Sequence, residues 1–383
     1  MTRAVCARRA GIRMWRNLTR RRAISPLASA IVAGAVVAIV ASGCGSSPAS
    51  GSSPAGGATP SVGPIPSTPA PALPETGPLP AGVLASIPVD SASGIGFGFG
   101  SVWIGSHRSN LLTRIDPATG KVTAQIDTGM VSSCGTVGIG FGRVWVSGCD
   151  DDPEFVAVDP LTNQVVGRIP HTGLSVGFGA GSAWIGSVAA AGGPGPSMAY
   201  RLNPKTLAVQ ERFKLPGSGV AFGAGSAWVA DEANGTVARI DPATNKVIAV
   251  IPAGLPGADG TTAVFAAGYL WVYPGFFNPP AADKHDNKIW RIDPHGDTVT
   301  EKTLPGLSHL HPAFTTGQFA TGMGSLWLRG YGTAVYRYDA RTLRLIGAYP
   351  ADSAAIGMME PGFGSLWVSN MDTSTLWRDR LTS

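Results

Sequence analysis

Histidine and carboxylate side chains gather in a few stretches of this 383-residue chain, where they could bind a metal ion or transfer protons. His309 and His311 are separated by one residue, so on an extended segment both imidazoles would point the same way. The stretch "ADKHDN" adds Asp283, His285 and Asp286. We take His309, His311, His285 and Asp283 as candidate metal ligands. Because these residues match no established ligand spacing, solvated loop histidines are the alternative interpretation.

The stretch "CDDDPE" is a second candidate, because Asp150, Asp151 and Asp152 could hold Ca²⁺ through carboxylate oxygens. It lacks the alternating spacing of a calcium-binding loop, so a solvated acidic loop is the alternative. Other polar residues stand outside the repeated pattern described below: His107, His171, Asp231 and Glu232. No cofactor is firmly implied, although Mg²⁺, Ca²⁺ or Zn²⁺ would suit these side chains.

The first 43 residues have the layout of an export signal. Eight arginines, with no acidic residue among them, precede the apolar run "LASAIVAGAVVAIVA" and the small residues "SGC". The stretch "ASGC" resembles the lipobox of bacterial lipoproteins, in which the cysteine, here Cys44, becomes the lipidated first residue. The resemblance implies an exported protein held by lipid at the outer side of the cytoplasmic membrane. An uncleaved anchor and ordinary signal cleavage are the alternatives, and Met14 could be the true start.

Residues 44–82 are rich in Pro, Ser, Gly and Ala, and they hold a single charge, Glu75. Such tracts act as disordered or extended spacers, so we expect a tether that leads to a domain over residues 83–383. Without the eight arginines of the signal, 21 basic residues stand against 24 acidic residues. We therefore expect no nucleic-acid partner, because no basic surface remains.

A tryptophan after a small-residue turn recurs along residues 83–383, and its repeats define the elements that must position the candidate residues. The series is Trp103, Trp145, Trp184, Trp228, Trp271, Trp327 and Trp367. Most intervals are close to 42 residues, the length of a four-stranded propeller blade. Each repeat divides into four short segments with strand-like alternation, joined by Gly-containing or Asp-Pro turns. The sequence therefore predicts an all-β fold, a seven-bladed β-propeller of four-stranded blades.

The last repeat ends after its third segment, and the missing fourth segment stands at the start of the domain. Residues 83–90, "VLASIPVD", match "VIAVIPAG" of a complete repeat. We expect this segment to complete the seventh blade and close the ring. We also expect structural roles for two repeated residues: blade packing for the tryptophan, and turn hydrogen bonds for the Asp of the R-I-D-P element.

The large insertions fall in two classes of connection, from the second to the third strand and from the fourth strand to the next blade. Both classes emerge on one face, which we call the variable face and expect to be the functional surface. Cys134 precedes blade two and Cys149 follows its second strand. The two would emerge side by side and form a disulfide in an exported protein; free thiols are the alternative.

The repeats resemble those of the YVTN and streptogramin B (virginiamycin B) lyase-like group of bacterial propellers, whose blades carry comparable "W…IDP.TG.V" elements. The resemblance covers all seven blades but rests on framework residues. Enzymes of that group open a cyclic antibiotic by elimination, with His and Glu side chains and a magnesium ion, and none of those residues can be placed on this chain. The "DPATGKV" turn also resembles quinoprotein repeats. Because Ala124 stands where those carry a tryptophan, we expect no quinone cofactor.

We therefore expect a monomeric binding or sensory module in the cell envelope, anchored to the membrane by its N-terminal lipid. Its variable face would bind an unidentified small molecule, glycan or protein. A lyase-like or hydrolytic enzyme, dependent on a metal ion, is the alternative. The first interpretation rests on the tether and on the lack of a recognisable catalytic set, and the second rests on the family resemblance and the His/Asp grouping.

Overall fold

The structure is a computed structural model that describes residues 79–381 with internal gaps. The gaps are residues 134, 149–153, 171–172, 188–197, 232, 256–260, 275–287, 305–317, 330–333 and 352–356. The described residues form strands and turns without any helix. Within this part of the chain there is accordingly no helix with the length and apolarity needed to span a membrane.

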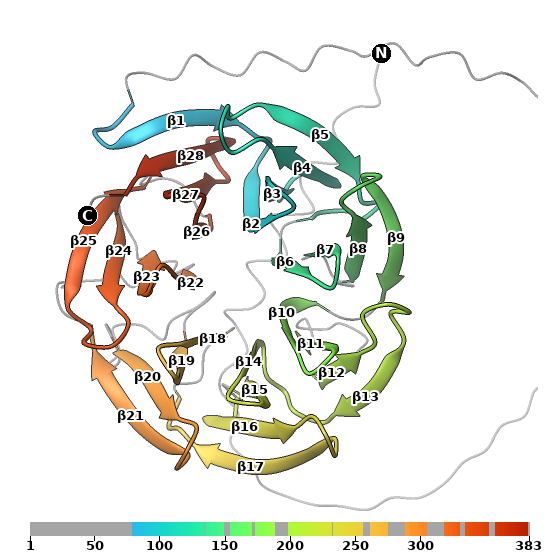
Figure 1. Cartoon of the computed structure of the whole chain (residues 1–383), viewed down its shortest axis with the longest axis vertical. Helices are drawn as coiled ribbons and strands as arrows, with labels where there is room; N and C mark the ends of the chain where they lie inside the picture. Colours follow the sequence, from blue (N-terminus) through green and yellow to red (C-terminus); the bar gives the residue numbers. More distant parts are fainter. Residues whose placement is uncertain are drawn as a thin grey trace, which may run out of the picture. The chain divides into compact units, whose positions relative to one another are not determined.

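Seven four-stranded antiparallel sheets surround a central axis like blades (Figure 1). Blade one comprises β2 (Ala92–Gly98), β3 (Ser101–Ser106), β4 (Leu111–Ile115) and β5 (Val122–Asp127). Blade two comprises β6 (Val137–Gly140), β7 (Arg143–Ser147), β8 (Phe155–Asp159) and β9 (Gln164–Ile169). Blade three comprises β10 (Leu174–Gly179), β11 (Ser182–Ser187), β12 (Met198–Leu202) and β13 (Val209–Phe213). Blade four comprises β14 (Gly219–Gly223), β15 (Ser226–Asp231), β16 (Thr236–Asp241) and β17 (Lys246–Pro252).

Blade five comprises β18 (Thr261–Ala266), β19 (Tyr269–Pro274), β20 (Lys288–Asp293) and β21 (Thr298–Thr303). Blade six comprises β22 (Gln318–Gly322), β23 (Ser325–Arg329), β24 (Ala334–Asp339) and β25 (Leu345–Pro350). Blade seven comprises β26 (Met359–Gly362), β27 (Ser365–Asn370), β28 (Thr375–Arg380) and the first strand of the domain, β1 (Val83–Pro88). These sheets confirm the predicted seven-bladed β-propeller.

The ring is closed by β1, which pairs antiparallel with β28 and brings Ile87 opposite Leu376. Both side chains lie in the hydrophobic core between blades seven and one, together with Trp367. The predicted closing role of residues 83–90 is therefore confirmed. Closure gives the last blade the same four strands as the others, and β1 pairs with the outer edge of β28.

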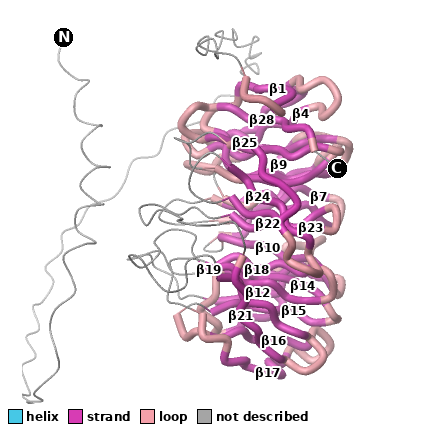
Figure 2. Tube along the Cα trace, turned by 90° about the vertical axis from the view of Figure 1, so that its left-hand side faces the viewer, coloured by secondary structure: helices cyan, strands magenta, loops and turns pink. Residues whose placement is uncertain are grey.

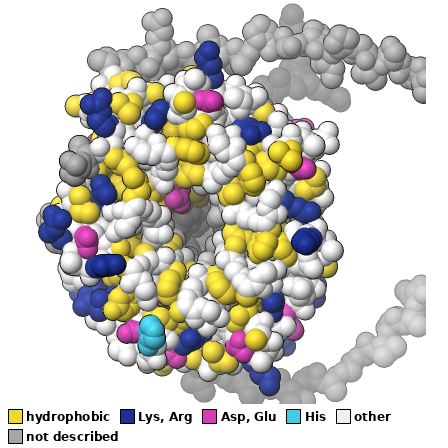
Figure 3. Space-filling model, in the orientation of Figure 1, with side chains coloured by type: hydrophobic (Ala, Val, Ile, Leu, Met, Phe, Trp, Pro, Cys, Tyr) yellow, Lys and Arg dark blue, Asp and Glu magenta, His cyan; other side chains and the backbone are white. Residues whose placement is uncertain are grey.

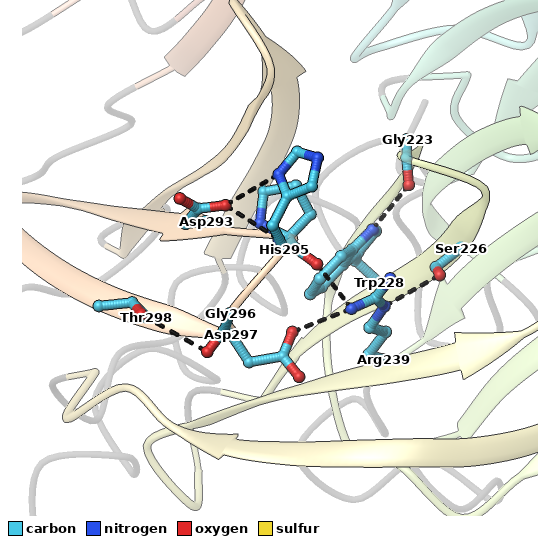
Figure 4. Close-up of polar contacts among 10 residues, drawn as sticks. Gly223, Ser226, Trp228, Arg239, Asp293, His295, Gly296, Asp297 and Thr298 are labelled. Carbon is cyan, nitrogen blue, oxygen red and sulfur yellow. Dashed lines mark hydrogen bonds and ion pairs between the residues drawn. The ribbon is translucent and has the colours of Figure 1, made fainter.

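The repeated tryptophan lies on the second strand of each blade and is buried between blades. Trp228, for example, packs between blades four and five with Leu270 and Val272. Its indole Nε1 donates to the carbonyl oxygen of Gly223 on the first strand, at 3.0 Å (Figure 4). The indoles of the other six blades make the same bond over 3.0–3.2 Å. The predicted packing role is confirmed, and the bond satisfies the one polar atom of each buried ring.

Tight turns join the first and second strands on the face opposite the variable face, which we call the turn face. In blade four the two central residues, Ala224 and Gly225, have φ angles of 48° and 72°. Positive φ at both positions defines a type I′ turn, whose twist matches that of the flanking strands. Figure 2 shows the strands running between the two faces, with turns along the right-hand side.

In four blades, an arginine on the third strand donates a hydrogen bond to the next blade. Arg239 lies over the ring of Trp228, donates from Nε to Ser226 Oγ at 3.0 Å, and donates from Nη1 to the carbonyl of Pro294 in the next blade at 2.7 Å (Figure 4). Equivalent bonds to the next blade are made by Arg114, Arg201 and Arg378. Each arginine therefore joins two strands of its own blade to the turn of the next.

Blade two departs from this arrangement, because Ala157 occupies the third-strand position of the arginine and Arg143 replaces the second-strand serine. Arg143 Nη2 donates to the carbonyl of Lys205 in the blade-three turn, at 2.8 Å. The bond between blades two and three thus comes from the adjacent strand.

The Asp of the R-I-D-P element closes the turn between the third and fourth strands, as predicted. Asp116 Oδ1 accepts from the backbone N–H of Ala118 at 2.9 Å and of Thr119 at 2.8 Å. These bonds stabilise the ionised form, and those to Thr119 contribute most to the lowered pKa of the Asp116 carboxyl. The repeated carboxylate is therefore engaged in the turn.

Candidate functional site

The structure describes two of the candidate site residues, His107 and Asp231. The others lie outside the described residues: Cys44, Cys134, Cys149, Asp150, Asp151, Asp152, His171, Glu232, Asp283, His285, Asp286, His309 and His311. Within the part of the chain that is described, His, Cys, Asp and Glu side chains form no group of three or more that could hold a metal ion. The metal, calcium and disulfide hypotheses remain predictions.

His107 follows β3 at the variable face, where three blades meet. Its backbone N–H donates to the carbonyl of Ser91 at 2.9 Å, and its carbonyl accepts from Ser132 Oγ at 2.9 Å. The imidazole is solvent-exposed, yet the surrounding protein partly desolvates it. This desolvation, followed by the Arg108 guanidinium, lowers the pKa of His107, while Asp372 opposes the shift. The ring is therefore neutral at pH 7 and can both donate and accept a hydrogen bond.

Asp231, at the end of β15, has a local structural role. Its side chain is 3% exposed, and Oδ1 accepts from the backbone N–H of Asn234 at 3.0 Å. Oδ2 accepts from Asn234 Nδ2 at 2.7 Å. Both carboxylate oxygens therefore help to close the turn between β15 and β16.

Glu360 is a functional candidate that motif reasoning missed. It lies on β26, opposite Trp367 of β27. The residues opposite the repeated tryptophan in the other blades are Gly96, Gly138, Gly177, Ala221, Val264 and Ala320. Across the seven innermost strands, Glu360 is the only ionisable residue. Alignment of the repeats by their tryptophans would have identified it.

The setting of Glu360 favours the protonated carboxyl. The side chain is partly buried, and burial raises its pKa to about 8. The adjacent strands β2, β22 and β27 carry no ionisable side chain that could offset the charge. Figure 3 shows the turn face hollowed at its centre, with an acidic side chain at the rim over β26 and mainly uncharged side chains around it.

Asp379 is a second carboxyl at an exceptional position. On β28 it occupies the site that Ile115, Val158, Leu202, Ile240, Ile292 and Tyr338 fill in the other blades. It is fully buried, and neither carboxyl oxygen has a hydrogen-bond partner among the described residues. Burial raises its pKa to about 7. This carboxyl is accordingly a destabilising element within the core.

Arg329, at the end of β23, fixes the variable-face ends of blades six and seven. It is 3% exposed, and Nη1 donates to the carbonyl of Ser369 at 2.7 Å. Nη2 donates to Asn370 Oδ1 at 3.2 Å. His107, Arg329 and Glu360 thus lie in three consecutive blades of the ring: one, six and seven.

One sequence pattern associated with serine nucleophiles has a structural explanation. Gly173, Ser175 and Gly177 match G-x-S-x-G, but Ser175 lies within β10 and not on a strand-to-helix turn. Its Oγ donates to the carbonyl of Ser218 and accepts from the backbone N–H of Val220 at 3.1 Å. Ser175 thus joins blades three and four.

No protein-family model matches the chain. No curated protein matches it in sequence either. Among solved structures, it is similar to a computationally designed protein, Ika8, with 12% identity and a TM-score of 0.51, over 78% of this chain and 99% of that one. It is also similar to BamB from Moraxella catarrhalis, with 14% identity and a TM-score of 0.47, over 76% of this chain and 84% of that one. The Ika8 likeness concerns the fold alone, and the BamB score is too low to carry a conclusion.

Proposed function

We propose that this protein is a ligand-binding module of the cell envelope, anchored through Cys44 and binding its ligand at the variable face. One contrast within the second strands supports this proposal. Toward the turn face, each strand carries the same buried tryptophan with the same hydrogen bond. Toward the variable face, the residue two positions after the tryptophan differs among blades: Gly105, Ser147, Gly186, Ala230, Tyr273, Arg329 and Ser369. These residues are buried, so they shape the strand ends from which the variable-face connections leave. A uniform framework beneath connections that differ from blade to blade suits selective binding.

Paired variants of the full chain test which face binds. A thermal-shift screen of small molecules and oligosaccharides would supply ligands. We expect the stabilisation by such a ligand to be lost in a variant with His107→Ala and Arg108→Ala at the variable face. A matched variant with Thr119→Ala and Arg341→Ala at the turn face should retain it. Ligands whose effect depends on the turn-face variant, or on neither, would contradict the proposed location.

The proposed anchor has its own test. Cys44→Ser should remove lipid labelling and release the protein from the membrane fraction on cell fractionation. A Cys6→Ser variant is the matched control, because Cys6 lies within the proposed signal. Retention of Cys44→Ser at the membrane with undiminished lipid labelling would exclude lipidation at this residue.

A lyase-like or hydrolytic enzyme is the second candidate, and the neutral, exposed imidazole of His107 at the variable face favours it. Metal analysis of the purified protein is the first measurement. Combined His285→Ala, His309→Ala and His311→Ala substitutions should then abolish metal binding and any turnover. Unchanged metal content in this variant would exclude these histidines as ligands.

A further inference from the structure

We propose that the central channel binds a primary ammonium group, held by the Glu360 carboxylate and by backbone carbonyls of the innermost strands. The proposal goes beyond the ligand-binding function proposed above, because it places a second site in the channel, at the level of the tryptophan opposite Glu360, and not at the variable face. It starts from the topology of β26, which pairs with β27 along one edge and has its other edge toward the axis. The free edges of all seven innermost strands present carbonyl and N–H groups that no ladder occupies. Pro361, next to Glu360, contributes no N–H donor.

A glutamate at this position is not explained by packing. In blade one, a Cβ added to Gly96 would lie 2.7 Å from Val137 of the next blade. In blade two, a Cβ added to Gly138 would lie 2.5 Å from Val176. In these two blades the close approach of the neighbouring blade leaves no room for a side chain. Glu360 lies on β26, which contacts β2 of blade one and β22 of blade six.

When Glu360 is ionised, none of the strands adjacent to it supplies a counter-charge. Burial alone raises the pKa of its carboxyl, and β2, β22 and β27 bring no ionisable group to it. A carboxylate withdrawn from water is costly unless a counter-charge compensates it. A divalent metal requires several charged or carbonyl ligands in fixed geometry, whereas an ammonium needs one carboxylate and a few acceptors for its three N–H donors. A single carboxylate beside free carbonyls matches the ammonium.

The proposal predicts that binding is coupled to proton release. Because the free carboxyl has a pKa of about 8, it is mostly protonated at pH 6 and mostly ionised at pH 9. A primary alkylammonium keeps its charge over this range, since its pKa is close to that of lysine, about 10.4. Its affinity should therefore fall on the order of 100-fold between pH 9 and pH 6, in proportion to the ionised fraction of Glu360.

The experiment measures binding of n-butylammonium to the full chain by ligand-observed NMR, with butan-1-ol as the uncharged analogue. We expect Glu360→Gln to weaken butylammonium binding at least tenfold at pH 9 and to leave butanol unaffected. Glu211→Gln, on the outermost strand β13, is the matched control and should bind like the parent protein. Equal affinity of the parent and Glu360→Gln would overturn the proposal.

Two readouts keep the test decisive. If Glu360→Gln fails to fold, Glu360→Ala decides in its place, because alanine is the residue at the equivalent position of blades four and six; butylammonium affinity equal to that of the parent protein is incompatible with a Glu360 site. The outcome is also separable from that of the proposed function. Suppose that the variable-face variant no longer binds the screened ligands, while Glu360→Gln binds butylammonium as the parent protein does. This result would overturn the channel site and leave the proposed function intact.

Discussion

Arg239 of blade four and Asp297 of blade five form an ion pair across the blade boundary, with Nη1 3.1 Å from Oδ1. The two side chains are 20% and 33% exposed, so water screens the pair only in part. Asp297 adopts a φ of 51° in its turn, where blades two and four carry Asn163 and Asn245. Those asparagines accept the equivalent bond from Arg114 and Arg201. All three boundaries therefore have the arginine hydrogen bond, whereas the negative charge of the acceptor is found only at the boundary between blades four and five.

Substitution at this boundary separates the two contributions. Arg239→Ala should lower the free energy of unfolding by about 1–3 kcal/mol, because it removes three hydrogen bonds and the contact with Trp228. Asp297→Asn should cost less than about 1 kcal/mol, since the acceptor remains. Denaturant unfolding measures both, with the exposed Arg212→Ala as control. A cost of Asp297→Asn equal to that of Arg239→Ala would show that the charge dominates.

Blade two offers a test of whether the arginine position is transferable. Arg143→Ser alone should destabilise the protein by about 1–2 kcal/mol, because the backbone carbonyl of Lys205 loses the hydrogen bond that Arg143 donates. Adding Ala157→Arg restores the serine and arginine pair of the other blades and should recover most of the loss in thermal unfolding. No recovery in the double variant would mean that the blade-three turn cannot accept an arginine from β8.

Asp379 makes stability depend on pH in a defined direction. Its folded-state pKa of about 7 exceeds the ordinary 3.8, so the folded state retains a proton that the unfolded state releases. Stability from this group is therefore full below about pH 4 and is lost as pH rises through 7. The loss at pH 8 is at most about 4 kcal/mol, the free-energy equivalent of the pKa difference.

Asp379→Val tests this assignment, because valine fills the equivalent site at Val158. The variant should be more stable than the parent at pH 8, and the gain should shrink toward pH 4 in denaturant unfolding. Asp379→Asn is the control that removes the titration but keeps a buried polar group. A destabilised Asp379→Val would indicate a partner for this carboxyl beyond the described residues.

The predicted disulfide between Cys134 and Cys149 can be checked by intact mass under non-reducing conditions, which should be lower by two hydrogens than the reduced mass. The backbone N–H of Gly135 donates to the carbonyl of Ser147 at 3.0 Å, so residues near both cysteines are paired. A bond closing about fifteen residues would contribute roughly 3 kcal/mol. Cys134→Ser should lower the melting temperature accordingly, and Cys134→Ser with Cys149→Ser should lower it no further.

The fold was predictable because its signals are local and repeated. The spacing of the tryptophans fixes the blade length, and the match of residues 83–90 to a fourth strand identifies the closure. The bonds between blades were not predicted. In blade two, for example, Arg143 on the second strand takes the role that a third-strand arginine has in other blades, and this is visible only once neighbouring strands are paired. Glu360 and Asp379 were missed for a related reason. Neither forms a motif, and each is exceptional only against the equivalent residues of other blades.

The candidate site was predictable only in outline. The insertions in the sequence indicate variation in two classes of connection, and the described strand ends do vary there. It could not establish which side chains meet, because contacts among loop residues depend on backbone paths that no repeat constrains. For His107 and Asp231 the structure supplies those contacts, and they differ. One side chain is exposed beside a charged pair, and the other is engaged in a turn.

The pairing of β1 with β28 has a consequence for biosynthesis. Val83 lies opposite Asp379, so the first strand of the ring must wait for a partner made about 300 residues later. At about 5–20 residues per second, the ribosome needs on the order of 15–60 s to supply it. Six blades can form from contiguous sequence during this interval, but the seventh cannot. A nascent chain therefore carries an unpaired strand at its leading end until translation of the domain is complete, and chaperones have that time to bind it.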